Sequence, residues 1–190
     1  MLVLVVGPSG AGKDTLLDAA RRALARDRRF RFVRRAITRP AEAGFEAHEA
    51  LNEAEFAVRE RAGGFALAWR AHGLAYGIPA DIVIDLAAGR VVIANVSRAV
   101  LAEATTRFPT RIIEVTAGSD VLARRLAARG RESAAEVSAR LSRTVPHVVA
   151  DETTVNDGDL AEAVENFLGA LNRAAGSARP AERAYFRRTG

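Results

Sequence analysis

A glycine-rich loop near the start of the chain constrains the fold more than any other feature. The apolar run Met1–Val6 leads into this loop, and an amphipathic helical pattern starts at Asp14. The loop reads Gly7-Pro8-Ser9-Gly10-Ala11-Gly12-Lys13. Glycines let successive backbone N–H groups turn inward, and the following helix adds the favourable end of its dipole. A strand, a glycine loop that ends in lysine, and a helix together predict a phosphate-binding P-loop in an α/β protein.

The residues after the loop lysine depart from the usual P-loop pattern. A hydroxyl residue that ligates magnesium normally comes next, but here Asp14 follows the lysine and Thr15 comes after it. The aspartate that usually ends a later strand and holds the metal through water is also missing, since Val91–Val96 ends in Asn95 and Val96. Magnesium prefers hard oxygen ligands, so we expect Asp14 to supply the missing carboxylate. The alternative is that Asp14 only caps the helix through the dipole.

Apolar and helical patterns alternate along the chain. Strands are expected at Met1–Val6, Phe30–Ile37, Phe65–Trp69, Arg90–Val96, Arg111–Val115 and Glu152–Val155. Helices are expected at Asp14–Arg26, Glu53–Arg61, Ala80–Ala88, Arg98–Arg107, Val121–Ala128, Ala134–Arg143 and Leu160–Leu171. This alternation indicates a three-layer α/β fold with a mostly parallel central sheet.

Capping and turn residues set the expected boundaries between these elements. Asn52 and Ser119 are expected to cap the helices that follow them. Thr38–Leu51 is polar and is expected to be a loop, and Gly73–Pro79 is expected to be a turn-rich stretch.

The composition favours one globular domain with an anionic partner. Hydrophobic residues make up 49% of the 190 residues, enough for a core, so we expect one domain over 1–175 and a disordered basic tail over 176–190. A net charge of +5 favours nucleic acid or a phosphorylated small molecule as the partner. The chain has no cysteine, which excludes a disulfide framework and a thiolate metal site.

Membrane and nucleic-acid partners are not expected. The sequence has no apolar run near the ~20 residues that a membrane span needs, and a cytoplasmic location follows as the default. It also lacks a nucleic-acid-binding motif or an aromatic stacking pattern.

Lys13 is the only lysine, in a chain that otherwise uses arginine for positive charge. This choice marks a position where a compact ammonium is needed and a planar guanidinium does not fit.

Beyond the glycine loop, the chain resembles the guanylate kinase family of P-loop kinases. The matching stretches follow the family order over roughly residues 2–171. They are Thr38-Arg39-Pro40, Trp69 with His72-Gly73 and Tyr76-Gly77, Leu122–Arg143 with Arg125-Leu126, Arg129-Gly130 and Arg140-Leu141, and Val155-Asn156-Asp157. The resemblance implies ATP as phosphoryl donor, an acceptor-binding region at about 34–78 and a lid at about 125–143.

The positions that bind guanine in that family are not kept. The loop Ala41–Glu49 is short and carries no tyrosine, Ala68 replaces a glutamate, and Ile78 replaces a hydroxyl residue. A pocket that selects a base needs hydrogen-bond partners for it, and their loss costs orders of magnitude in discrimination. We therefore do not expect guanine recognition, and keep a GMP kinase as the alternative within the enzymes.

One branch of the family is similar to this chain at its unusual positions. The ribose 1,5-bisphosphate phosphokinases of phosphonate catabolism share four stretches with it, namely Gly12-Lys13-Asp14, Ile37-Thr38-Arg39, His48-Glu49 and Asn95-Val96-Ser97-Arg98. The resemblance implies that ATP and ribose 1,5-bisphosphate give ADP and 5-phosphoribosyl 1-diphosphate. The attacking oxygen is then already an anionic phosphate oxygen. No general base is needed, and catalysis depends on cations that align and neutralise two polyanions.

Four cations are the expected catalytic residues. Lys13 reaches the β- and γ-phosphates, and Arg39, with Arg35, grips a phosphate of the acceptor through the arginine fork. By resemblance, Arg129 and Arg140 are lid residues that close over ATP and exclude water. For the neighbouring Arg125 and Arg131, two roles remain as alternatives: a contact with phosphate, or a surface ion pair with Glu132 or Glu136.

The remaining site residues divide into two expected groups. The group for ATP and Mg²⁺ is Gly7, Pro8, Ser9, Gly10, Ala11, Gly12, Lys13, Asp14, Thr15 and, at the adenine, Asn156, with Asp14 as the metal ligand. The group for the phosphorylated sugar is Arg35, Arg39, His48, Tyr76, Asn95, Ser97 and Arg98. The last three sit at the carboxyl end of a strand, where open α/β sheets bind ligands.

A non-catalytic interaction module is the alternative from another class, because guanylate-kinase-like domains can lose catalysis and bind partner proteins. The intact loop Gly7–Lys13 argues against it, since a scaffold has no need of a phosphate cradle.

Overall fold

The computed structural model describes residues 1–40, 47–128 and 149–178. Its centre is a five-stranded sheet in the order β2-β7-β1-β8-β9, and every neighbouring pair is parallel. The strands are β1 (Leu2–Val6), β2 (Phe30–Phe32), β7 (Val91–Asn95), β8 (Thr110–Thr116) and β9 (Glu152–Val155). β1 lies in the middle and is fully buried, which explains its unbroken apolar sequence.

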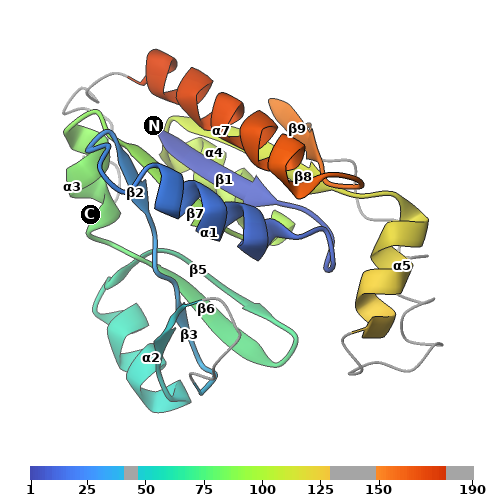
Figure 1. Ribbon diagram of the computed structural model, residues 1–190. Helices are drawn as coiled ribbons and strands as arrows, with labels where there is room; N and C mark the ends of the chain where they lie inside the picture. Colours follow the sequence, from blue (N-terminus) through green and yellow to red (C-terminus); the bar gives the residue numbers. More distant parts are fainter. Residues whose placement is uncertain (41–46, 129–148, 179–190) are drawn as a thin grey trace.

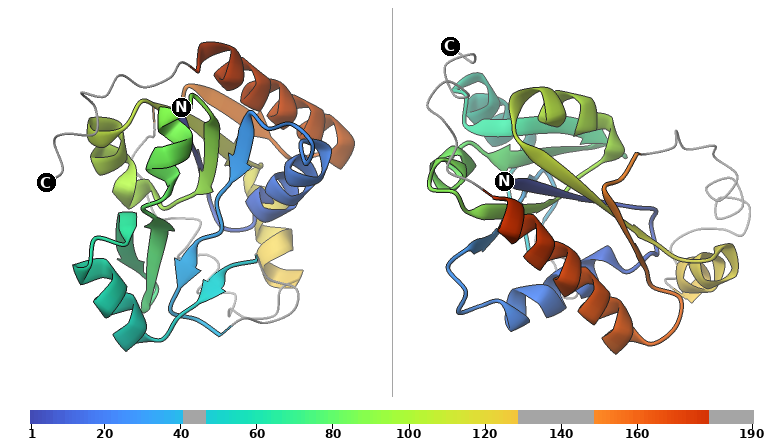
Figure 2. Two further views of the ribbon diagram at one scale, coloured as in Figure 1. Left: turned by 90° about the vertical axis from the view of Figure 1, so that its left-hand side faces the viewer. Right: turned by 90° about the horizontal axis from the view of Figure 1, so that it is seen from above.

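Helices cover both faces of this sheet (Figures 1 and 2). α1 (Lys13–Ala23) and α7 (Leu160–Ser177) contact each other on the face that receives Val3 and Val5. α3 (Ile82–Ala87) and α4 (Leu101–Arg107), with the short 3-10 turn η1 (Arg98–Val100), pack on the face that receives Leu4. Alternate side chains of β1 thus pack into two separate hydrophobic cores, one on each face of the sheet. This arrangement confirms the expected three-layer α/β fold.

A second, smaller sheet lies below the first in Figure 1 and has the order β4-β3-β6-β5. Its strands are β3 (Ala36–Ile37), β4 (Glu49–Ala50), β5 (Phe65–Ala71) and β6 (Leu74–Pro79). β5 and β6 form an antiparallel hairpin whose turn is His72-Gly73, both with positive φ, as a type I′ hairpin turn requires. α2 (Glu53–Arg61) packs on this sheet, with the Phe56 ring stacked on Phe65 at 4.6 Å.

Local signals placed several boundaries correctly. Asn52 caps α2 with a complete capping box: its side chain accepts from the Glu55 amide at 2.9 Å, and the Glu55 carboxylate accepts from the Asn52 amide at 2.8 Å. α5 (Ser119–Ala128) follows β8, but Ser119 is its first residue rather than its cap. α7 extends to Ser177, beyond the expected end at Leu171 and two residues beyond the expected domain limit at 175. The expected helix Ala134–Arg143 lies outside the described residues.

Three expectations about strands and loops were wrong. Phe30–Ile37 is not one strand, because β2 ends with the bond from the Val33 amide to the Ile93 carbonyl, and the chain then crosses to β3 in the other sheet. In the expected turn-rich stretch Gly73–Pro79, only Gly73 belongs to a turn, and Leu74–Pro79 forms the strand β6. Gly77 lies within it because a Cβ there would approach the Phe65 ring to 2.5 Å, so its glycine serves close packing rather than a turn. β4 likewise interrupts the expected loop Thr38–Leu51.

An ion-pair cluster ties the point where the chain leaves the central sheet to the point where it returns. Arg31 on β2 bonds to the carboxylates of Asp81 and Asp85, at 2.8 Å for Asp81. Asp85 is 8% exposed and also accepts from Arg90, at the start of β7. Burial raises the pKa of the Asp85 carboxyl, but hydrogen bonds and charge from Arg31 and Arg90 outweigh it and hold the pKa below its ordinary value.

Within residues 1–40, 47–128 and 149–178, none of the helices combines the length and apolar character of a membrane span.

Candidate active site

The glycine loop is a tight cradle between β1 and α1. Gly7 has φ 146°, and a Cβ there would lie 2.0 Å from the Val115 carbonyl oxygen of β8. Gly12 has φ 86°, and a Cβ there would meet the Asn156 side chain at 2.3 Å. Both positions therefore require glycine, for conformation and for space. The chain presses the loop against β8 and against the residue that follows β9.

Lys13 closes the cradle from inside. It is the first residue of α1, and its Nζ donates to the carbonyls of Gly7 at 2.8 Å and Pro8 at 2.9 Å. These bonds hold the ammonium of the chain's one lysine over the loop. Together with the N-terminus of α1, the ammonium makes the loop a site for negative charge.

Asp14 and Asn95 meet across the same edge of the sheet. Asp14 is exposed in the first turn of α1, while Asn95 ends β7 and is 8% exposed. The Asn95 Nδ2 donates to the Asp14 Oδ1 at 3.0 Å. The carboxylate and amide oxygens of this pair are the hard donors that suit magnesium, so the residues present fit such an ion. Thr15, the next residue of α1, is exposed.

The floor of the cradle is built by residues that come after β8 and β9. Asn156 is 3% exposed, and its Nδ2 donates to the Ala11 carbonyl at 2.8 Å. Asp157 accepts from the Gly118 amide at 2.6 Å, which joins the ends of β8 and β9. Asn156 thus supports the loop from beneath, and the contact with adenine that the sequence predicts for it is not tested by this geometry.

Arg125 brings a second cation to the loop. From α5, its Nη1 donates to the Gly10 carbonyl at 3.4 Å. From the sequence, Arg125 could either contact phosphate or form a surface ion pair. The position of Arg125 beside Gly10 favours the phosphate contact. Arg129 and Arg140, which were expected to belong to a lid, lie outside the described residues, as does Arg131.

Ser97 and Arg98 follow Asn95 at the carboxyl edge, and both have structural partners. The Ser97 Oγ accepts from the Ala99 amide at 3.3 Å and caps η1. Arg98 donates to the Glu114 Oε1 of β8 at 2.6 Å. Glu114 was not predicted as a partner from the sequence, although a glutamate within the expected strand Arg111–Val115 was a signal. The predicted contacts of Ser97 and Arg98 with a sugar phosphate stay predictions.

Arg39 follows β3 on the smaller sheet, and its backbone is fixed from two sides. The preceding residue, Thr38, accepts from the Ala75 amide through its Oγ1 at 2.8 Å. The ring of His48 is 3% exposed and lies 3.0 Å, through Nε2, from the Arg39 carbonyl. A carbonyl oxygen only accepts, so Nε2 is the donor. His48 was expected to line the acceptor site, and the structure joins it to the expected acceptor residue Arg39.

Arg35, Tyr76 and Trp69 form a stack on the smaller sheet. The Arg35 guanidinium lies 5.5 Å from the Tyr76 ring centroid, and that ring stacks on Trp69 at 5.3 Å with an interplanar angle of 6°. Trp69 is 7% exposed and belongs to the core. The stack gives Arg35 a fixed aromatic support, as cation–π geometry does. The pairs Arg35–Tyr76 and Arg39–His48 therefore both lie along the neighbouring strands β4, β3 and β6 of the smaller sheet.

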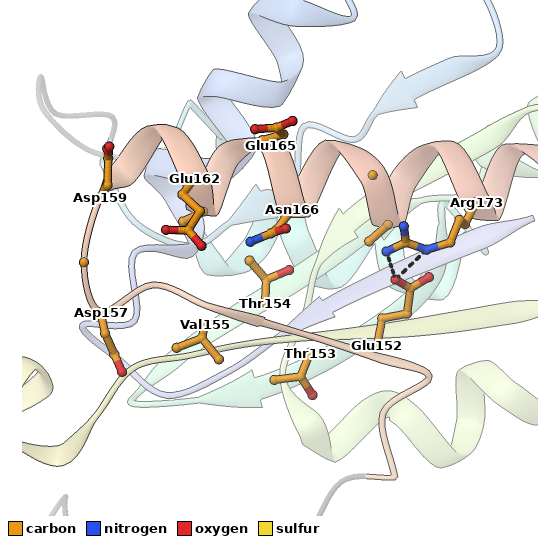
Figure 3. A pocket seen from close by; sticks show the side chains of 14 residues that line it. Glu152, Thr153, Thr154, Val155, Asp157, Asp159, Glu162, Glu165, Asn166 and Arg173 are labelled. Atoms are coloured by element: carbon orange, nitrogen blue, oxygen red, sulfur yellow. Dashed lines mark hydrogen bonds and ion pairs between the residues drawn. The ribbon is translucent and has the colours of Figure 1, made fainter.

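A pocket of about 540 Å³ between β9 and α7 is separate from the loop and differs from it in charge (Figure 3). Its lining includes Glu152, Asp157, Asp159, Glu162 and Glu165. Arg173 is the one basic residue among the described lining residues, and it is paired with Glu152. An acidic lining repels phosphates, so this pocket is not part of the phosphate site.

The parallel sheet, the glycine cradle with its lysine, and the smaller second sheet define a P-loop kinase of guanylate kinase architecture. The solved structure of guanylate kinase from Anaplasma phagocytophilum shares this fold, with a TM-score of 0.63 at 17% identity over 92% of this chain and 86% of that chain. No protein-family model matches the chain.

Sequence relatives define the family within this class. Ribose 1,5-bisphosphate phosphokinase PhnN of Acidiphilium cryptum is 53% identical over 90% of this chain and 92% of that protein. The protein of the same name from Agrobacterium fabrum is 46% identical over 94% of this chain and 100% of its own length. The chain belongs to the ribose 1,5-bisphosphate phosphokinase family and is a kinase, as its unusual sequence positions predicted.

Proposed function

We propose that this protein transfers the γ-phosphoryl group of ATP to the 1-phosphate of ribose 1,5-bisphosphate. An oxygen of the 1-phosphate forms a bond to the γ-phosphorus, the bond from that phosphorus to the β–γ bridging oxygen breaks, and ADP leaves with the bond electrons. The products are ADP and 5-phosphoribosyl 1-diphosphate. The observation that carries the choice of acceptor is the 53% identity to a relative named for it, over nearly the whole of both chains.

The residues of the cradle support ATP as the donor. Loop amides, the α1 N-terminus and the Lys13 ammonium bind the β- and γ-phosphates, and Arg125 adds charge beside Gly10. Magnesium, when bound through Asp14, neutralises charge on the phosphates. The family resemblance adds Arg129 and Arg140, which lie outside the described residues, as further cations for ATP.

The residues of the smaller sheet support a phosphorylated acceptor. Arg39 binds a phosphate of the sugar, and Arg35, on its aromatic support at the other end of β3, adds a second cation. Because the attacking oxygen is anionic at neutral pH, these cations hold and align it, and no residue has to remove a proton. Asn95, Ser97 and Arg98 border the same reaction centre from the edge of the central sheet.

GMP is disfavoured as acceptor by the side chains available on the smaller sheet. Ile78 stands where guanylate kinases use a hydroxyl residue, and it is fully buried in the core. Ala68, in register with Gly77, offers no carboxylate for a guanine edge. A base bound there would leave its polar groups unpaired.

A direct assay tests the proposal. The protein is given ATP and magnesium with ribose 1,5-bisphosphate, then with GMP, while ADP and the phosphorylated product are measured. We expect turnover with the bisphosphate and little with GMP. Turnover with GMP alone would overturn the acceptor, and no turnover with either would favour a non-catalytic interaction module.

A further inference from the structure

At the two positions that usually hold magnesium in P-loop enzymes, this chain carries its carboxylate at the other position. The usual arrangement has a hydroxyl residue after the loop lysine and an aspartate in or after a later strand. Here the carboxylate, Asp14, follows the lysine, and a neutral amide, Asn95, ends β7. β7 is the strand next to β1, and Val5 of β1 is in register with Asn95. The two positions are therefore the usual ones, with the charge moved from the strand to the helix.

We propose that Asp14 and Asn95 form a transposed metal pair, in which Asn95 is a positioning residue for the Asp14 carboxylate. The bond from Asn95 Nδ2 to Asp14 Oδ1, at 3.0 Å, fixes the carboxylate and leaves its Oδ2 for a divalent cation or a water bound to it. This assignment rests on the proposed function, because the cation is the one that accompanies ATP.

The burial of the two residues suits these roles. Asn95 is 8% exposed and sits on a rigid strand, where an amide needs a partner but carries no charge to desolvate. Asp14 is exposed in the first turn of α1, where a metal ion from solution reaches it and the helix dipole favours its negative charge. The pair keeps one negative charge in total. Asn95 thereby belongs to the metal side of the site rather than to the acceptor, where the sequence had placed it.

Moving the carboxylate from position 14 to position 95 by mutation tests the pair. ATP binding is measured by calorimetry with and without Mg²⁺, and the ratio of the two affinities is the magnesium enhancement. We expect Asp14→Asn to reduce this enhancement roughly 10- to 100-fold while metal-free ATP binding is kept, because a ligand to the ion is lost. The double variant Asp14→Asn with Asn95→Asp should regain most of it, since the carboxylate returns to the usual strand position.

A matched control and a fallback keep the test decisive. Asp18→Asn removes one carboxylate from the next turn of α1, where it pairs with Arg21, and should leave the enhancement unchanged. If the double variant does not fold, as judged by thermal unfolding, Asn95→Ala replaces it, with an expected loss of roughly tenfold in enhancement. Full enhancement in Asp14→Asn overturns the pair, as does a folded double variant that stays as weak as Asp14→Asn.

The failure of the pair and the failure of the proposed function are distinguishable. A wild-type protein that phosphorylates the bisphosphate, with an Asp14→Asn variant that keeps full magnesium enhancement, rejects the pair alone. A wild-type protein that shows the enhancement and its loss in Asp14→Asn, but phosphorylates only GMP, rejects the proposed acceptor and supports the pair.

Discussion

Lys13 is the one basic position at which this chain uses lysine, while arginine fills the other 27. Its ammonium is bonded to two carbonyls of its own loop, at 2.8 Å and 2.9 Å. A guanidinium is larger and planar and spreads its donors over a fork, so it does not fit between two carbonyls of a seven-residue loop. The choice of residue therefore reflects the space inside the cradle.

Replacing Lys13 by arginine should remove activity although the charge is kept. We expect Lys13→Arg to lower kcat by about a hundredfold or more, because charge stabilisation at the transferred phosphoryl group depends on donors that are placed in advance. Steady-state assays with ATP and the bisphosphate measure this loss. Arg22→Lys, at an exposed position of α1, is the matched control and should keep wild-type kcat. Near-normal activity in Lys13→Arg would show that charge alone suffices.

Some site residues could be predicted from the sequence and others could not, for a physical reason. The cradle is contiguous, so its glycines and lysine were predicted. The bond from Asn95 to Asp14 and that from Asn156 to Ala11 join residues 81 and 145 positions apart. Such long-range partners depend on strand order, which the local pattern does not contain. The residue types of Asn95 and Asn156 indicated that they belong to the site, but not which residues they contact.

Among the elements, the strands buried on both faces were the most predictable. β1 and β7 read as apolar runs because helices cover both sides of the sheet, and every residue of these two strands is buried. β3, with two residues, and β6, which holds Gly77 and Pro79, gave weak or misleading signals. Their pairing comes from neighbours in the smaller sheet, so tertiary contacts override the local preference there.

The cluster around Asp85 stabilises the junction of β2, α3 and β7. We expect Asp85→Asn to lower the free energy of unfolding at pH 7 by about 2 kcal/mol, because two arginines lose a charged acceptor. The folded-state pKa of Asp85 lies below its ordinary value of 3.8, so its stabilisation is present above that value and is lost as the pH falls through the folded pKa. The difference between the variant and the wild type should therefore shrink below about pH 4.

Urea unfolding at pH 7 and at about pH 3 measures both parts of this prediction. Asp81→Asn is the control, because Asp81 binds the same Arg31 but its side chain is 58% exposed. We expect it to cost less than ~1 kcal/mol, as exposed ion pairs do. A deficit of Asp85→Asn that stays equal at both pH values would contradict the electrostatic explanation.

At the scale of the whole molecule, the two sheets divide the proposed work. The edge of the central sheet carries the cradle and the Asp14–Asn95 pair, and the smaller sheet carries Arg39 and the Arg35–Tyr76–Trp69 stack (Figure 1). Changes on the smaller sheet should therefore affect the acceptor and leave ATP binding intact.

His48 allows this division to be tested, because it acts through the Arg39 carbonyl. We expect His48→Leu to raise the KM for the bisphosphate roughly tenfold, with the KM for ATP unchanged. His48→Gln should recover most of the loss, since its amide N–H can donate to the same carbonyl. Equal changes in both KM values, or no rescue by glutamine, would indicate a general packing role instead.

The Arg31 contacts with Asp81 and Asp85 have a consequence for how such enzymes diversify. They bring together the two places where the chain crosses between the sheets, so residues 33–80 begin and end at neighbouring points. A stretch anchored in this way is one contiguous segment that leaves the central sheet and returns to it at the same place. Leu67, Trp69 and Ile78 within this stretch share a core with β1, so a replacement segment must keep those core contacts while the acceptor-facing side chains change.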